Sequence, residues 1–170
     1  MMARSVKVFF PHIAFALSLA ASAQVEASAP SDMGLQAALA FQNTCLATRT
    51  KGSDAAVASI LSRPNAKEGP NLPAYGGGKP MRTFSDGKFE YLVRFGKSGA
   101  YGCFVALNGD VDLAGSVKAS IDALAGVQAK PLKNGKKVFY EWTVIGSKDE
   151  IRLTPKSNIG AILINLEVIS

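Results

Sequence analysis

Histidine is almost absent from this sequence: the only one among 170 residues is His12. It lies in a segment with the features of a secretory signal peptide, so we expect the processed chain to contain none. Without histidine a protein cannot form Ser-His or Cys-His nucleophile pairs, and it has no imidazole ligands for zinc, copper or non-haem iron. We therefore predict a protein that is not an enzyme and that carries no metal and no cofactor.

Cysteine is scarce as well, with two residues, Cys45 and Cys103. Their spacing excludes the Cys-x-x-Cys motif of thiol–disulfide oxidoreductases. In an exported chain two cysteines form a structural disulfide more often than a metal site, so we predict a Cys45–Cys103 bridge. Two buried free thiols, or one reactive thiol, are the alternatives that the sequence leaves open.

The sequence also lacks an apolar run long enough to cross a membrane, which takes about 20 residues. The apolar run at residues 13–20 is shorter, follows a start with two cations and precedes the small residues Ala-Ser-Ala at positions 21–23. This pattern is typical of a cleaved secretory signal peptide. We expect a signal peptide at residues 1–23, with a second possible cleavage site after Ala27.

Two segments remain after cleavage. Residues 24–30 are small and are expected to form a flexible tail, and residues 31–170 have the length of a single domain. We expect no transmembrane segment in the processed chain, and a periplasmic or secreted location in a bacterium.

Acidic residues are outnumbered by basic ones. The formal charge is +6, and it falls to +4 because Arg4 and Lys7 leave with the signal peptide. This mild excess either favours anionic polymers or lipid headgroups of the cell envelope or serves solubility alone. The cations are scattered and do not alternate with aromatic residues, so we predict no nucleic-acid partner.

A β-hairpin is the clearest structural signal, at residues 88–107. From Phe89 to Phe95, aromatic residues and valine alternate with the set Glu90, Leu92 and Arg94, a period typical of a half-buried strand. The turn Gly96-Lys97-Ser98-Gly99 has glycine at both ends, which suits a tight reversal. The return strand carries Cys103.

Helical spacing predicts three helices. The first begins at Asp32, and we expect Leu35 and Leu39 to face the sheet. The second lies between Ser53 and Pro64, and the third follows Asp112.

Three further strands are expected at residues 137–145, 150–154 and 159–169. The predicted fold class is therefore α+β. We expect a five-stranded, mainly antiparallel sheet with a ββαβββ core and two N-terminal helices packed on it.

Residues 63–87 are rich in proline and glycine and are expected to form an irregular loop. Loops of this length in compact domains are often functional, so this one is the candidate binding site. Its candidate binding residues are Arg63, Lys67, Tyr75, Lys79, Arg82 and Phe84. The alternative is a packed connector without a function of its own.

Residues 85–88 match the Ser-x-x-Lys motif of penicillin-recognising enzymes. That motif places the lysine one helical turn after the serine, whereas Asp86-Gly87 is a turn pair that leads into a strand. We therefore interpret the match as chance.

Two resemblances add to this interpretation. The segments FQNTC at residues 41–45 and YGCFV at residues 101–105 resemble those of small exported bacterial proteins of unassigned function with one helix-to-strand disulfide. The order of the last six expected elements resembles that of profilin-like and PAS-like domains. The second resemblance implies a sensor or interaction module without catalysis of its own.

Three functions remain open. The leading hypothesis is an exported, non-enzymatic binding or interaction module of the bacterial cell envelope, whose partner is an envelope polymer or a protein. The first alternative is a secreted factor that binds or inhibits a host or competitor protein. The second alternative is a hydrolase that works without histidine, through carboxylates or a Ser-Lys pair.

Overall fold

The computed structural model describes residues 32–73, 80–96, 98–130, 139–157 and 160–169. The expected signal peptide and tail, and the candidate residues Tyr75 and Lys79, lie outside these ranges.

Eight strands form within the described ranges, all in one sheet of order β1-β2-β3-β4-β8-β7-β6-β5. The strands are β1 Lys67–Glu68, β2 Arg82–Ser85, β3 Glu90–Phe95, β4 Tyr101–Leu107, β5 Val127–Ala129, β6 Tyr140–Val144, β7 Glu150–Thr154 and β8 Ile162–Val168. Every neighbouring pair is antiparallel. The predicted α+β class is confirmed, but the prediction of five strands is wrong. The strands β1, β2 and β5 were not predicted, because they are too short to show a period of two.

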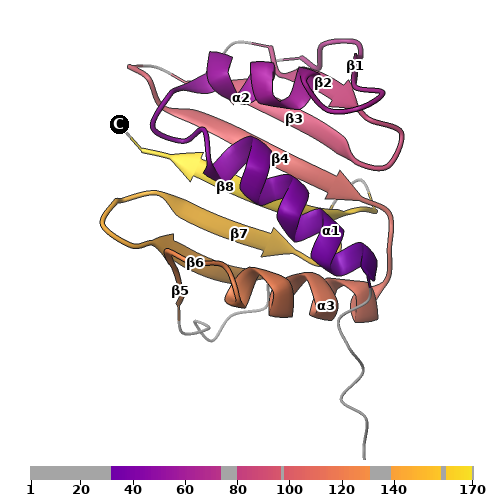
Figure 1. The fold of residues 1–170 in the computed structure, drawn as a ribbon, viewed down its shortest axis with the longest axis vertical. Coiled ribbons are helices and arrows are strands. Elements are labelled where there is room, and N and C mark those ends of the chain that lie inside the picture. The colour runs from indigo at the N-terminus through magenta and orange to yellow at the C-terminus, as the bar shows by residue number, and fades with distance from the viewer. Residues whose placement is uncertain (1–31, 74–79, 97, 131–138, 158–159, 170) are drawn as a thin grey trace, which may run out of the picture.

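The helices are α1 Asp32–Phe41, α2 Ser53–Leu61 and α3 Val111–Asp122, and a π-helical turn, η1 Gln42–Leu46, continues α1. The same arrangement, a helix followed by a four-stranded meander, occurs twice along the chain. Helix α2 is followed by the meander β1–β4, and helix α3 is followed by the meander β5–β8. The last strands of the two meanders, β4 and β8, pair along the centre of the sheet. The sheet is therefore two helix-plus-meander units joined edge to edge (Figure 1).

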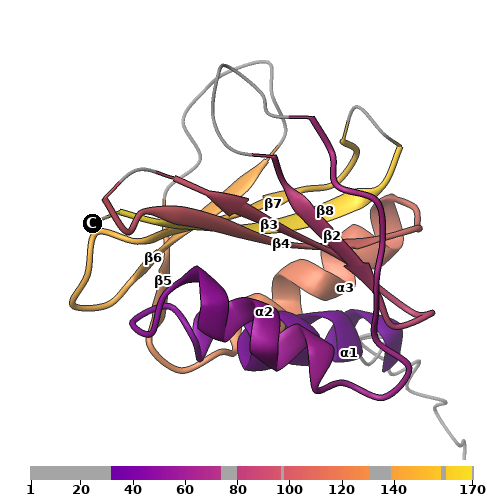
Figure 2. The ribbon, with the colours of Figure 1, turned by 90° about the horizontal axis from the view of Figure 1, so that it is seen from above.

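The three helices cover one face of the sheet, and no described helix lies on the other face (Figure 2). Strand residues alternate between the two faces, and those on the helix side form the core. The core includes Phe84, Tyr91, Val93, Cys103, Val105, Trp142, Ile151, Leu153, Ile162, Ile164 and Leu166. The side of the sheet opposite the helices is called the open face below.

The predicted hairpin of β3 and β4 is confirmed, with Val93 opposite Cys103 and Leu92 opposite Phe104. Gly99 in the turn has φ +86°, a conformation that glycine adopts without strain. The period of two was a reliable signal here because β3 and β4 carry buried residues on one face.

The predicted buried face of α1 is wrong. Leu35 and Leu39 are 46% and 41% exposed, whereas Gly34, Ala37 and Ala38 are buried. Helix α1 runs across the sheet between α2 and α3 (Figure 1), where neighbouring backbones come close and small side chains fit. Close packing between helices, rather than the largest apolar side chains, therefore sets the orientation of α1.

Substitution of Gly34 tests this close packing. A Cβ at Gly34 would lie 2.8 Å from Cβ and 3.0 Å from the carbonyl carbon of Ser116 on α3. We expect Gly34→Ala to lower the free energy of unfolding by about 2 kcal/mol, because overpacking outweighs the gain in helix propensity. Urea denaturation followed by circular dichroism measures this.

The matched control is Gly115→Ala on α3, where an added Cβ meets nothing within 4 Å. This variant should be more stable than the wild type by up to about 1 kcal/mol, because alanine favours the helix. A stabilising effect at both positions would contradict the packing that we describe for α1.

The predicted disulfide is present. Cys45 on η1 is bonded to Cys103 on β4, with their Cα atoms 5.5 Å apart. In η1 the Thr44 hydroxyl donates to the Ala40 carbonyl at 2.6 Å. In a regular α-helix a backbone N–H would use this carbonyl as its acceptor, so the hydroxyl competes with the helical hydrogen bond. The bridge therefore fastens the end of the α1–η1 segment to the central part of the sheet.

Candidate functional site

The segment at residues 63–87 is more ordered than predicted. It contains β1 and β2, and between them the backbones of Leu72 and Met81 exchange two hydrogen bonds of 2.9 and 3.1 Å. The expectation of an irregular loop is therefore wrong for its described part. The strands β1 and β2 were not predicted, because the proline and glycine residues around them indicate turns and loops.

The structure places the described candidate binding residues in different settings. Phe84 is fully buried, and Lys67 is exposed on the edge strand β1. Arg82 forms a two-pronged ion pair with Glu68 at 2.8 and 2.9 Å and stacks on the Phe84 ring. Arg63 is paired with a carboxylate at the β2–β3 turn. A binding role for these residues stays a prediction.

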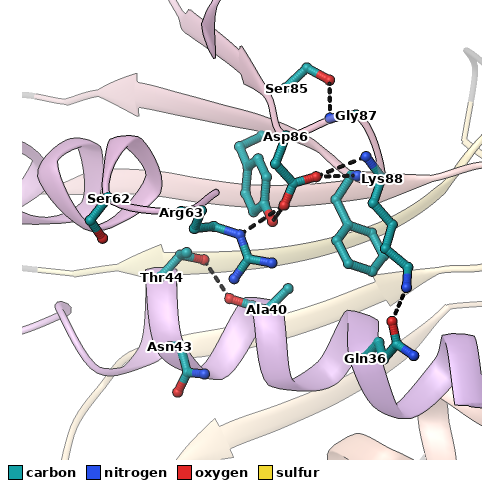
Figure 3. A network of polar contacts seen from close by, with 12 residues as sticks. Gln36, Ala40, Asn43, Thr44, Ser62, Arg63, Ser85, Asp86, Gly87 and Lys88 are labelled. Atoms are coloured by element: carbon teal, nitrogen blue, oxygen red, sulfur yellow. Dashed lines mark hydrogen bonds and ion pairs between the residues drawn. The ribbon is translucent and has the colours of Figure 1, made fainter. Parts of the chain in front are cut away.

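The carboxylate paired with Arg63 is Asp86, the centre of a buried network between α2 and the β2–β3 turn (Figure 3). Its Oδ1 accepts hydrogen bonds from the backbone N–H groups of Lys88 at 2.9 Å and Phe89 at 2.8 Å. Its Oδ2 accepts from Arg63 Nε and from the Tyr91 hydroxyl, both at 2.8 Å. Three of the four donors lie between Lys88 and Tyr91, and the fourth, Arg63, lies just after α2.

The network shifts two pKa values. Burial alone would raise the pKa of Asp86, but the hydrogen bonds from Phe89, Arg63, Tyr91 and Lys88 outweigh it and lower the pKa to about 2. Burial, together with the hydrogen bond to Asp86, raises the pKa of the Tyr91 hydroxyl. At neutral pH Asp86 is therefore charged and Tyr91 is neutral.

Perturbed pKa values often mark active sites, but the geometry here favours a structural role. Each oxygen of Asp86 already accepts two hydrogen bonds, so neither is available to take a proton from a substrate. Asp86 is a positioning residue that fixes the β2–β3 turn against the end of α2.

The Ser-x-x-Lys match is not assembled into a site. The Ser85 hydroxyl accepts a hydrogen bond from the Gly87 N–H at 3.2 Å. The Lys88 ammonium extends the other way and donates to the Gln36 side chain on α1 (Figure 3). The structure therefore agrees with the interpretation that the motif occurs by chance.

A second buried carboxylate, Asp149, has a similar structural role at the end of β8. It accepts a hydrogen bond from the Ile169 N–H at 3.1 Å and lies 3.8 Å from Arg49 Nε. Asp149 therefore ties the end of β8 to the β6–β7 turn and to the segment after η1.

The open face carries a groove of about 410 Å³. Leu92 and Ala106 come from the sheet, and Pro70 and Leu72 come from the segment between β1 and β2. Leu72 is 39% exposed although it is large and apolar. The volume lies in the range of small-molecule sites, so this groove is the candidate binding site.

The Asp86 network and the groove share the β2–β3 turn. Gly87, Lys88 and Glu90 contribute to the groove, while Asp86 binds the N–H groups of Lys88 and Phe89 on the helix side. Because the network fixes this turn, it also fixes one end of the groove.

Most charges on the open face are paired. Arg94 lies 2.5 Å from Glu167, Arg152 lies 2.7 Å from Glu141, and Lys130 lies 2.5 Å from Glu150. Glu90 has no ion-pair partner among the described residues. Among the described residues, the groove therefore contains an open-face carboxylate that has no ion-pair partner.

The groove was not predicted from the sequence. One signal was available, because Leu92 is an apolar residue between Glu90 and Arg94 on what otherwise reads as the polar face of a strand. The contribution of Leu72 could not be predicted, because it depends on the backbone pairing with Met81.

Among the described residues, no cluster of three or more histidine, cysteine, aspartate or glutamate side chains could hold a metal ion. No helix in the same part of the chain has the length and apolar character that a bilayer crossing requires.

Comparison of the chain with protein-family models, with curated proteins and with solved structures found no match.

Proposed function

We propose that this chain is an exported, non-enzymatic binding module of the bacterial cell envelope that holds a small ligand in the groove on the open face of its sheet. The observation that carries the proposal is the groove itself, where Leu72, Leu92 and Ala106 offer apolar surface beside polar groups. Concave, mostly apolar surfaces with a few polar groups are typical of ligand sites.

The arrangement of the two faces supports a binding role. The helices, the disulfide and the Asp86 network all lie on the covered side and hold the sheet together. No described helix covers the open face, so its strands can contact a ligand directly.

The exposed leucines of α1 favour a second candidate, a secreted factor that binds a host or competitor protein. Leu35 and Leu39 are one helical turn apart and form a small apolar surface on the outside of the helix layer. Such surfaces occur at protein–protein contacts.

Native mass spectrometry of the protein purified from its own bacterium, from periplasm and medium separately, tests both candidates. We expect extra noncovalent mass of small-molecule size that is lost on unfolding. In Leu72→Asn the occupancy should fall by about tenfold or more, because one apolar wall of the groove becomes polar. A bound protein instead of a small molecule would favour the second candidate.

The matched control is Ile145→Asn, which changes another exposed apolar residue, in the β6–β7 turn away from the groove. Its occupancy should equal that of the wild type. Loss of the bound molecule in both variants, or in neither, would overturn the proposal that the groove holds the ligand.

A further inference from the structure

The unpaired carboxylate of Glu90 sets the charge of the groove. The other three glutamates of the open face, Glu141, Glu150 and Glu167, each have a basic partner within 2.7 Å. Glu90 is exposed, contributes to the groove, and has no such partner in the part of the chain that the structure describes. A ligand in the groove therefore meets a carboxylate that forms no ion pair with any described residue, and the nearest open-face cation in the same cross-strand row is Lys67 on β1, two strands away.

Lys88 is the basic residue that contributes to the groove, but its charge is directed elsewhere. Its ammonium donates to the Gln36 side chain and lies 5.9 Å from the centre of the Phe89 ring, which is buried on the helix side. Figure 3 shows the side chain extending toward α1. Lys88 therefore leaves the carboxylate of Glu90 free for a ligand.

The remaining groove surface is mixed, with apolar residues beside the polar side chains of Thr83 and Asn108. Pro70 and Leu72 lie on one side, Leu92 and Ala106 lie on the sheet, and Ala161 lies before β8. A ligand that fits has an apolar body for this surface and a positive group for Glu90. A carboxylate or phosphate at the same end would be repelled.

We propose that the ligand of the groove is a small organic cation, a primary amine or guanidinium carried on an apolar body, with its charged end at Glu90 and its body against Leu72 and Leu92. This inference rests on the proposed binding function and adds the chemical class of the ligand. Apolar contact provides most of the affinity, and Glu90 provides the selection for positive charge.

Three probes of equal chain length test the proposal: n-hexylamine, n-hexanol and hexanoate. Each is titrated into the isotope-labelled protein, and the dissociation constant is taken from the shifts of the groove backbone amides, such as those of Gly87 and Leu92. We expect the amine to bind about fivefold more tightly than the alcohol, because the ion pair is exposed, and the carboxylate to bind most weakly. The preference for the amine should shrink as salt is added.

Two variants test whether Glu90 causes the preference for the amine. Glu90→Gln should abolish the preference for the amine over hexanol. Glu141→Gln, on the same face but away from the groove, should keep the wild-type preference. Both positions lie on the open face outside the buried core, so both variants are expected to fold, and the amide spectrum verifies this.

The outcomes separate this inference from the proposed function. Equal binding of amine and alcohol, both weakened by Leu72→Asn, would overturn the cation preference and leave the groove as a binding site. An unchanged preference in Glu90→Gln would also overturn it. If none of the probes shifts the groove amides, the inference is wrong, and the mass spectrometry of the purified protein decides the proposed function by itself.

Discussion

Reduction of the Cys45–Cys103 disulfide should lower the free energy of unfolding by about 4 kcal/mol. The bridge joins residues 58 positions apart, and in the chain-entropy model a loop of this length restricts the unfolded chain by about that amount. Both half-cystines are fully buried in the core between η1 and β4. The main effect therefore arises in the unfolded state.

Urea denaturation of the processed protein with and without a reductant measures this difference. The Cys45→Ala, Cys103→Ala double variant is the control, because its stability should not respond to the reductant. It should also be less stable than the reduced wild type, because two buried sulfur atoms are lost. Equal stability of the oxidised and reduced wild type would contradict a structural role for the bridge.

Asp86→Asn should lower the free energy of unfolding by about 3 kcal/mol at neutral pH, because the change leaves buried donors without an anionic acceptor. The side chain of Asp86 is 6% exposed and accepts four hydrogen bonds, two of them from Arg63 and Tyr91. An asparagine side chain has one acceptor oxygen and an NH₂ group that would face donors.

The sign of the pH dependence follows from the lowered pKa of Asp86. The folded state holds this pKa at about 2, below the ordinary value of 3.8, so the folded protein binds the proton less readily than the unfolded chain. The ionised carboxylate therefore contributes about 2 kcal/mol above pH 3.8, and this is lost as the pH falls from 3.8 through 2. In Asp86→Asn this part of the acid sensitivity should be absent.

Denaturation at a series of pH values, for the wild type and two variants, checks both expectations. Asp112→Asn is the control, because Asp112 is exposed in the first turn of α3 and its loss should cost less than about 1 kcal/mol. Equal stability changes at Asp86 and Asp112 would show that the network contributes no more than a surface charge. Because Asp86 fixes the turn that ends the groove, its substitution should also weaken ligand binding.

The sequence was most informative where a local pattern and a buried face coincide. Alternation predicted β3 and β4, and the register that places Val93 opposite Cys103 agrees with it. The two cysteines, in a chain that reads as exported, predicted the disulfide. Both predictions depend on chemistry that short stretches of sequence carry by themselves.

The groove lies partly in the predicted segment, but none of the predicted binding residues that the structure describes contributes to it. The sequence drew attention to residues 63–87, and this segment does contribute Pro70 and Leu72 to the groove. It could not show that Phe84 belongs to the core or that Arg63 and Arg82 are held by Asp86 and Glu68. Those outcomes depend on partners outside the local pattern of each residue.

The sequence by itself determined the α+β class and the β3–β4 hairpin. Tertiary structure decided which face of α1 is buried, because the close approach of α3 favours Gly34 and Ala37 over Leu35 and Leu39. It also decided the groove and the absence of an ion-pair partner for Glu90 among the described residues, because both depend on which strands lie side by side and which charges find a partner. Periodicity and composition are local properties, whereas close packing and charge pairing join residues that are far apart in the chain.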